Sequence, residues 1–207
     1  MSIKLVWFAM LLKIVQAGEP VLRATASALP QEKIALAQTQ VVIDWMRETM
    51  RDAPGVGLAA PQVGISLQLA VIEDRPEYLR DLPSEVLADR ERSPVDFHAL
   101  INPRIVERSE EQVEYYEGCL SLAGFSALVK RSRAVTVEYL DERGAEHRVE
   151  ARGWYARILQ HEIDHLNGKL YIDRMEPRSF TNLENMGRHW KNMTIPAVRR
   201  ALRLPES

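Results

Sequence analysis

The segment from about Trp154 to Leu166 has the hydrophobic spacing of a mostly buried α-helix. One stripe of this helix is wholly apolar and consists of Leu159, Ile163 and Leu166. A second stripe combines one apolar residue with three ionisable ones: Ile158, His161, Glu162 and His165. The third stripe is polar: Arg157, Gln160, Asp164 and Asn167. Asn167-Gly168 is a typical helix stop, and buried ionisable groups are costly unless they are paired or bound to a metal.

The pattern elsewhere predicts one further long helix and several strands. Alternating or continuous apolar positions predict strands at 67–72, 99–106, 112–116, 135–140, 146–151 and 170–172. The fourth and fifth of these flank the turn Asp141–Gly144 and form a predicted hairpin. The long helix is predicted from Pro30 to about Asp52. Because helices and strands do not alternate regularly, we expect an α+β fold, with mainly antiparallel sheets packed around a central helix.

Three segments lack a clear period. Gly55 to Gly64 reads as a tight loop, and Asp74 to Asp96 reads as a surface excursion with one helical turn. Residues 176–207 form a C-terminal tail, which we expect to be helical and broken by Pro196. The apolar run 5–12 is too short to cross a bilayer. It indicates either an N-terminal strand or residues that precede a start at Met10.

Composition indicates an ordinary globular chain. The 207 residues suffice for one domain spanning 1–207, with a core at 10–175. Hydrophobic residues make up 46%, charged residues 27%, and the net charge is −2. This charge gives no general case for binding nucleic acid or a membrane. Cys119 is the single cysteine, so a disulfide within the chain is excluded.

The most informative motif is QHEIDH, which places His161, Glu162 and His165 in an HExxH arrangement. Histidines four positions apart on a helix lie on one face and can bind a single metal ion, with the intervening glutamate as general base. The motif therefore predicts metal-assisted hydrolysis. Two residues compete as third ligand. Cys119 is one, although a lone cysteine is more often a small buried apolar residue. Glu184 is the other, and it would make the chain a zinc endopeptidase.

Three motifs in order, GVGLAAPQ, EGCLS and QHEIDH, resemble those of the peptide deformylase family. The resemblance extends from about Ile14 to Met175 and looks closer to the organelle-type branch. It implies a hydrolase that removes the formyl group from the N-formylmethionine of nascent polypeptides. It also implies Cys119, His161 and His165 as ligands of one divalent metal ion per chain, natively Fe(II) and replaceable by zinc, nickel or cobalt. Three such ligands leave the fourth tetrahedral position for water.

The resemblance also implies roles for other residues. Glu162 is expected to take a proton from the attacking water and pass it to the leaving amine. Gln62 and the backbone N–H of Leu120 are the expected oxyanion donors. Further residues are expected to bind the substrate or line its methionine pocket: Gly55, Val56, Gly57, Glu117, Gly118, Trp154 and Ile158. The glycines in this group are expected to let the loop backbone approach an extended peptide.

Two carboxylates are candidates for orienting the metal-binding histidines. They are Glu117 and Asp164, paired with Arg131 or Arg133, although a solvated role for Asp164 fits its polar stripe equally well. The chain departs from the family at Ala123, where a proline is common. It departs again at Ser126, where some members carry an arginine.

The resemblance implies formylated nascent peptides as partners and leaves a contact with the ribosome and the oligomeric state open. A non-enzymatic ribosome-associated binder is the second alternative, because the tail from Phe180 to Ser207 has five Lys/Arg against two Glu. The location implied is cytoplasmic in a bacterium, or organellar in a eukaryote, although no convincing transit peptide is present.

Overall fold

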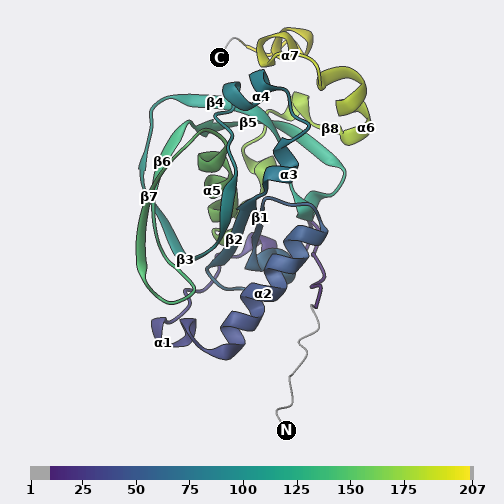
Figure 1. The fold of residues 1–207 in the computed structure, drawn as a ribbon. Coiled ribbons are helices and arrows are strands. Elements are labelled where there is room, and N and C mark those ends of the chain that lie inside the picture. The colour runs from purple at the N-terminus through teal and green to yellow at the C-terminus, as the bar shows by residue number, and fades with distance from the viewer. Residues whose placement is uncertain (1–9, 206–207) are drawn as a thin grey trace.

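The computed structural model describes residues 10–205 and places one helix between two antiparallel sheets (Figure 1). The helices are α1 (Gln31–Ile34), α2 (Ala37–Asp52), α3 (Pro76–Leu79), α4 (Ser84–Asp89), α5 (Gly153–Leu166), α6 (Leu183–Asn185) and α7 (Ile195–Ala201). The strands are β1 (Gly57–Ala59), β2 (Leu69–Asp74), β3 (Val95–Arg108), β4 (Gln112–Gly118), β5 (Phe125–Ser132), β6 (Ala134–Leu140), β7 (Glu146–Arg152) and β8 (Thr181–Asn182). The expected α+β fold with antiparallel sheets is confirmed.

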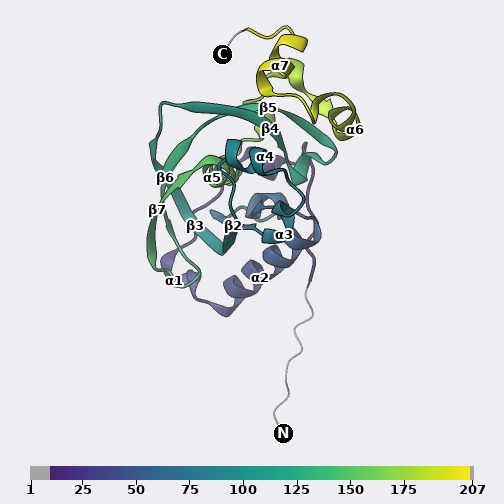
Figure 2. The ribbon, with the colours of Figure 1, turned by 45° about the horizontal axis from the view of Figure 1, so that its top comes forward.

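The larger sheet has five strands in the order β1-β2-β3-β6-β7. The predicted hairpin is confirmed, since β6 pairs with β7 from Ala134↔Arg152 to Leu140↔Glu146. One face of the sheet packs on α5, where Ile72, Leu100 and Val137 are fully buried against the helix's apolar residues. The other sheet has the order β4-β5-β8 and lies at the end of the molecule where α6 and α7 are found (Figures 1 and 2).

Strand β5 was missed in the sequence prediction. Its residues do not alternate between buried and exposed, because six of its eight positions are buried, including the run from Ser126 to Val129. The strand pairs with β4 along its whole length, from Gln112↔Ser132 to Gly118↔Ser126. A strand that is covered on both faces loses the period-2 signal on which sequence prediction depends.

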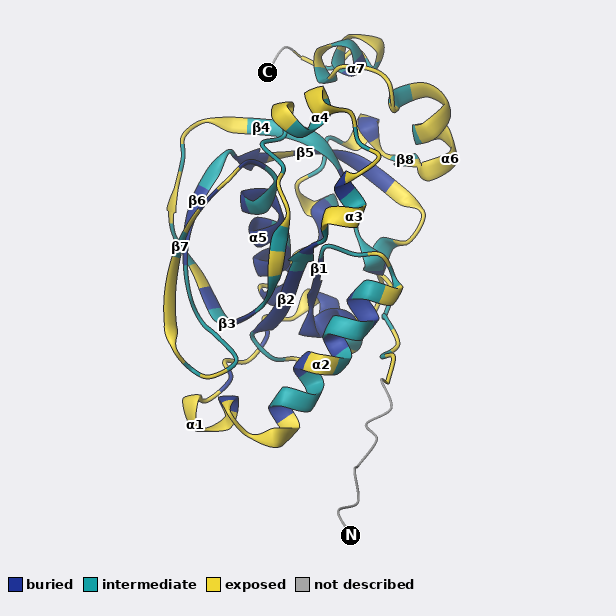
Figure 3. Ribbon diagram, in the orientation of Figure 1, coloured by how far each residue is buried: buried dark blue, intermediate teal, exposed yellow. Residues whose placement is uncertain are grey.

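Helix α5 is buried around its whole circumference (Figure 3). It ends as predicted, because Gly168 has φ +70°, a conformation that favours glycine, and its N–H donates to the His165 carbonyl. The polar stripe is not solvated. Arg157, Gln160 and Asp164 are 3%, 3% and 6% exposed, so this helix needs polar partners inside the protein.

The predicted helix from Pro30 to Asp52 is two helices, α1 and α2. Leu36 between them has ψ 143°, which is an extended conformation. Two side chains of α2 fold back and take up the free carbonyls of α1. Thr39 Oγ1 donates to Lys33 O at 2.7 Å, and Gln40 Nε2 donates to Ile34 O at 2.9 Å. These bonds satisfy the end of α1 and explain why the helix is interrupted there.

Three other predictions are corrected. The expected strand at 170–172 is a 3₁₀ turn, Tyr171–Asp173, because the Asp173 carboxylate accepts from the Leu170 N–H at 2.8 Å and closes the turn. Pro196 starts helix α7 rather than breaking one, since proline suits the first helical turn. The segment Gly55–Gly64 is a loop only in part: it contains β1 and a 3₁₀ turn at Ala60–Val63.

The proline-rich excursion carries two short helices, α3 and α4, rather than the one helical turn expected. It is tied to the core by Arg92, which donates to the fully buried Asp74 carboxylate at 2.7 and 2.9 Å. The apolar run 5–12 lies largely outside the described residues. Within residues 10–205, no helix has the length and apolar character needed to cross a membrane.

Candidate metal centre and active-site cleft

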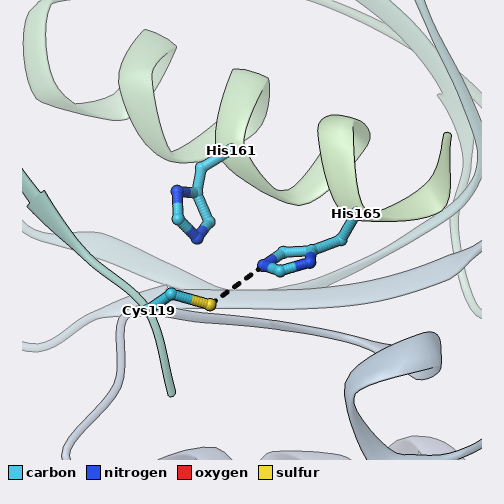
Figure 4. A group of neighbouring side chains, drawn as sticks. All are labelled: Cys119, His161 and His165. Carbon is cyan, nitrogen blue, oxygen red and sulfur yellow. Dashed lines mark hydrogen bonds between the residues drawn. The ribbon is translucent and has the colours of Figure 1, made fainter. Parts of the chain in front are cut away.

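Cys119, His161 and His165 meet at the inner face of α5 (Figure 4). Each residue offers one ligand atom, and these atoms all lie within 4.8 Å of one another. The Sγ of Cys119 is 3.2 Å from Nε2 of His165, and the two imidazole centroids are 4.9 Å apart. This convergence brings together all three residues that the resemblance implied as ligands.

The two sheets and the helix fix these side chains. Cys119 directly follows β4 and precedes the 3₁₀ helix Leu120–Leu122, and its backbone is extended. The histidines lie one turn apart on α5, as the HExxH spacing predicted. Cys119 is partly exposed to the cleft, whereas His165 is 1% exposed. The cluster therefore has one closed side in the protein interior and one side open to the cleft.

The donor set fits a catalytic divalent metal ion. Metal–nitrogen bonds of about 2.0–2.1 Å and metal–thiolate bonds of about 2.3 Å place tetrahedral ligand atoms roughly 3–4 Å apart. The 3.2 Å sulfur–nitrogen separation agrees with this. Burial lowers the pKa of His165 well below its ordinary value, which favours the neutral imidazole that a metal ligand requires. One thiolate and two imidazoles suit iron, zinc or nickel.

Glu117 orients the first histidine. Its carboxylate accepts from Nδ1–H of His161 at 3.0 Å, which turns Nε2 of that ring toward the cysteine. Arg131 donates to both Glu117 oxygens at 2.9 Å, and both side chains are almost fully buried. Burial alone would raise the pKa of Glu117, but the hydrogen bonds from Arg131 and His161 hold it well below its ordinary value. The open choice between Arg131 and Arg133 is thus settled, because Arg133 pairs with Glu91 and Glu111 instead.

The polar stripe of α5 is matched by partners from β5 and the following segment. Arg131 also donates to Asp164, and Arg174 donates to Asp164 at 2.6 and 2.8 Å. Arg157 donates to Glu117 at 2.5 Å. The Gln160 amide accepts from the Ser132 N–H through Oε1 and donates to the Ser132 carbonyl through Nε2. These contacts fasten the metal-binding helix to the sheet that supplies the cysteine.

Glu162 lies next to the cluster and lacks a strong partner. It is 3% exposed, and its Oε2 atom is buried without a hydrogen bond. Burial raises its pKa to about 7. Gly57 makes room for it: a Cβ at Gly57 would lie 2.2 Å from Oε1 of Glu162. This close approach explains why position 57 is a glycine: Glu162 needs the space. The explanation differs from the expected backbone contact with a peptide.

Gln62 faces the same site with its amide nitrogen. Its Oε1 accepts from the Ala59 N–H at 2.8 Å, which leaves Nε2 directed at Cys119 Sγ, 3.5 Å away, and Ser121 Oγ, 3.4 Å away. Leu120 is the first residue of its 3₁₀ helix, so its N–H has no acceptor within that helix. Two hydrogen-bond donors thus lie beside the candidate metal ligands.

A cleft of about 670 Å³ opens onto the cluster. Of the residues predicted for substrate binding and catalysis, all line this cleft: Gly55, Val56, Gly57, Gln62, Glu117, Gly118, Leu120, Trp154, Ile158 and Glu162. Sequence reasoning missed several further lining residues, among them Gln16, Arg92, Phe125 and Leu183. None of these four belongs to the three motifs. Gln16 comes from the N-terminal segment and Leu183 from the C-terminal segment.

Two regions lie apart from this site. A larger cleft of about 1160 Å³ runs between α4, β4 and α7 and contains none of the predicted site residues. Glu184, the alternative third ligand, has a side chain that is 75% exposed and pairs with Arg188 at 2.7 Å. Among residues 10–205, the ligand atoms that lie close enough to share one metal ion belong to Cys119, His161 and His165. Glu184 does not belong to this cluster.

Comparison with known proteins agrees with the geometry. The sequence model of polypeptide deformylases matches residues 11–180. The chloroplastic peptide deformylase 1A of Solanum lycopersicum is 45% identical over 173 residues, which cover 84% of this chain and 62% of that protein. Peptide deformylase 1 of Bifidobacterium longum is 46% identical over 188 residues, which cover 90% and 82%. Plant organelle and bacterial relatives are thus about equally similar, and the chain spans under two thirds of the length of the plant protein.

Solved structures show the same fold. The Met-Ala-Ser-bound class I type b peptide deformylase of Acinetobacter baumannii aligns with a TM-score of 0.73 and 31% identity, covering 81% of this chain and 100% of that one. The peptide deformylase of Thermotoga maritima aligns with a TM-score of 0.67 and 38% identity, covering 81% and 99%. With the family match over most of its length and the metal-ligand cluster at its centre, this chain belongs to the polypeptide deformylase family.

Proposed function

We propose that this chain hydrolyses the formamide of N-formylmethionine at the start of nascent polypeptides and releases formate. The observation that carries the proposal is the buried Glu162 carboxylate, with one oxygen unpartnered, beside a cysteine–histidine–histidine cluster at the end of a cleft. The peptide-bound relative from Acinetobacter baumannii supports an N-terminal methionine peptide as the ligand class.

Cys119, His161 and His165 would hold a divalent cation, which would supply Lewis-acid catalysis and would lower the pKa of water toward about 7. The protein's own groups do the rest. Glu162 accepts a proton as the water oxygen attacks the formyl carbon, and it returns that proton to the amine as the carbon–nitrogen bond breaks. The products are formate and a free amino terminus. Burial of Glu162 suits this role because it keeps the proton affinity of the carboxylate high.

The oxyanion that forms during attack needs hydrogen-bond donors. We propose the Gln62 amide and the Leu120 N–H as these donors. The Ala59 N–H holds the other end of the Gln62 side chain, which leaves its amide nitrogen free to donate. Loss of one such donor typically removes about 2.7–4 kcal/mol of transition-state stabilisation. Val56, Trp154 and Ile158 line the cleft and are proposed to contact the methionine side chain.

Formate release from formyl-Met-Ala-Ser tests the proposal. We expect Glu162→Gln to keep its metal and to lose turnover by roughly 10²–10⁴-fold, the usual contribution of a positioned acid–base group. Retained turnover in that variant would contradict the assigned role. Cys119→Ala should lose the metal, whereas Glu184→Ala should keep both metal and activity. The opposite pattern would support the endopeptidase alternative.

Fe(II) is proposed as the native ion, with zinc, nickel or cobalt able to replace it. The soft thiolate and two imidazoles suit all of these ions. Metal analysis of protein purified without oxygen should find iron. Exposure of that protein to air should abolish activity, because a thiolate–Fe(II) centre is open to oxidation. Protein reloaded with nickel should stay active in air, and full activity of the iron form after prolonged exposure would argue against iron.

A further inference from the structure

Three large apolar side chains gather at the rim of the active-site cleft. Phe125 and Phe180 are each 41% exposed, and Leu183 is 55% exposed. The two rings are stacked, with centroids 5.0 Å apart and planes 7° apart. Phe125 and Leu183 also line the cleft itself. Apolar surface that is both exposed and continuous with a ligand cleft is typical of a binding surface.

The rim is held in place by strand pairing. β8 adds to β5 in the register Phe125↔Asn182 and Ser126↔Thr181. The Leu183 N–H donates to the Gly124 carbonyl at 2.9 Å, which fixes the residue beside the cleft. An apolar surface that is already ordered loses little conformational freedom when it binds a ligand, so contacts to it contribute more fully to affinity.

Leu183 belongs to a segment beyond the family match, which ends at residue 180. This segment is fastened to the protein again at α7. Val198 is fully buried there, and Arg199 pairs with Glu114 at 2.7 Å between side chains that are 11% and 8% exposed. Figures 1 and 2 both show α6 and α7 lying over the end of the β4-β5-β8 sheet. The C-terminal segment therefore places one wall of the cleft.

We propose that Phe125, Phe180 and Leu183 form an apolar ledge for the substrate polypeptide, which binds an apolar side chain at the third or fourth residue. This rests on the proposed function, since the formyl group must lie at the metal-ligand cluster. The remaining chain then leaves past the rim, advancing about 3.3–3.6 Å per residue when extended. The ledge gives the enzyme a preference among formylated chains that the methionine pocket cannot supply.

A second copy of the protein is a poorer occupant. Stable protein–protein interfaces bury about 1,200–2,000 Å² in total. Two half-exposed rings and one leucine offer roughly 300 Å² at most, given that a fully buried aromatic contributes about 150–250 Å². A single apolar side chain of a bound peptide matches that size, and under the proposed function the peptide backbone would lie in the adjoining cleft.

The test compares three peptides: formyl-Met-Ala-Ser-Ser, formyl-Met-Ala-Leu-Ser and formyl-Met-Ala-Ser-Leu. For the unmodified protein, kcat/KM for at least one leucine peptide should exceed that for the all-serine one by roughly three- to tenfold, mostly through KM. Leu183→Ser and Phe180→Ser should each reduce this ratio to within about twofold. The ratio is taken within each variant, so a general loss of activity cancels.

Met193→Ser is the matched control. Met193 is an apolar residue of the same C-terminal segment, 36% exposed, and it lines the other cleft. Its variant should keep the full ratio. Equal rates for all three peptides, a ratio that survives both ledge substitutions, or the same loss in the control would each overturn the ledge.

Binding of the unformylated peptides, measured by titration calorimetry, separates the ledge from the proposed function. If no formylated peptide is hydrolysed, the proposed function fails. The calorimetric preference for the leucine peptides over Met-Ala-Ser-Ser, and its loss in Leu183→Ser, then decides the ledge alone. Tighter binding of a leucine peptide supports the ledge, and equal binding of all three refutes it.

Discussion

Gly57→Ala tests whether the space beside Glu162 is needed for catalysis. The added Cβ would lie 2.2, 2.6 and 2.9 Å from Oε1, Cδ and Cγ of Glu162, and these are the three nearest atoms. Ordinary contact begins at 3.4 Å, so the carboxylate has to move. Glu162 is 3% exposed and lines the cleft, so the carboxylate would be pushed from its place beside the cluster. The substitution therefore displaces the proposed base and leaves the metal ligands where they are.

The effects on stability and on rate should differ in size. Overpacking a buried site costs about 1–3 kcal/mol. Replacing a strand glycine by alanine recovers about 0.5–1 kcal/mol through the unfolded chain. The net loss of stability should thus be at most about 2.5 kcal/mol. Moving a catalytic group by roughly 1 Å costs about 100-fold in rate. We expect kcat to fall by that factor in a protein that is still folded.

Three measurements check this expectation: formate release, metal content and urea unfolding. Gly187→Ala is the control, because a Cβ there meets nothing within 4 Å, and it should match the unmodified protein in all three. A Gly57→Ala variant whose kcat stays within twofold of normal would refute the reasoning. Loss of metal together with activity would also refute it, since the ligands would then have moved.

Three further predictions concern the supports of the site and the surface. Arg131→Leu removes a buried cation from between two carboxylates and should destabilise the protein by about 3–5 kcal/mol in urea unfolding, with partial recovery in the lysine variant; a loss below 1 kcal/mol would contradict this. Gln16 donates to the Leu120 carbonyl at 3.0 Å, so Gln16→Ala should lower kcat/KM roughly three- to tenfold without moving the thermal midpoint. Hydrogen bonds from Arg51 lower the pKa of Glu73, so this pair stabilises the protein above the ordinary glutamate pKa and ceases to do so as the pH falls through the lowered value. Glu73→Gln should therefore cost about 0.5–1 kcal/mol at pH 7 and nothing at the acidic end, and a difference that grows on acidification would oppose the assignment.

The metal ligands could be predicted because their information is local. Two histidines and a glutamate in HExxH spacing define their own geometry on a helix, and EGCLS supplied the third ligand through the resemblance. The choice between Arg131 and Arg133 as partner of Glu117 could not be predicted. It depends on β5 ending at Ser132, after which Arg133 points to other carboxylates. That boundary is set by pairing with β4 and leaves no mark in the sequence.

The polar stripe of α5 is a second feature whose surroundings could not be predicted from the sequence. Asp164 has the sequence character of a solvated residue, and its burial requires two arginines that lie 33 and 10 positions away. The periodicity of a sequence shows which side chains are polar, but it does not show whether the fold brings an oppositely charged side chain into contact with them. The rim residue Leu183 was missed for a related reason. Its place beside the cleft follows from the pairing of a two-residue strand, which no periodicity can signal.

The sulfur and the second imidazole that meet at the metal site are 46 positions apart in the chain and belong to different layers of the fold. A polypeptide released or truncated soon after β5 possesses the thiol but no imidazole to complete the ion's cage. A chain of that length therefore offers a cation only one of the three ligands, the Cys119 thiol. The full set of three ligands is therefore present only after the chain has been extended past His165.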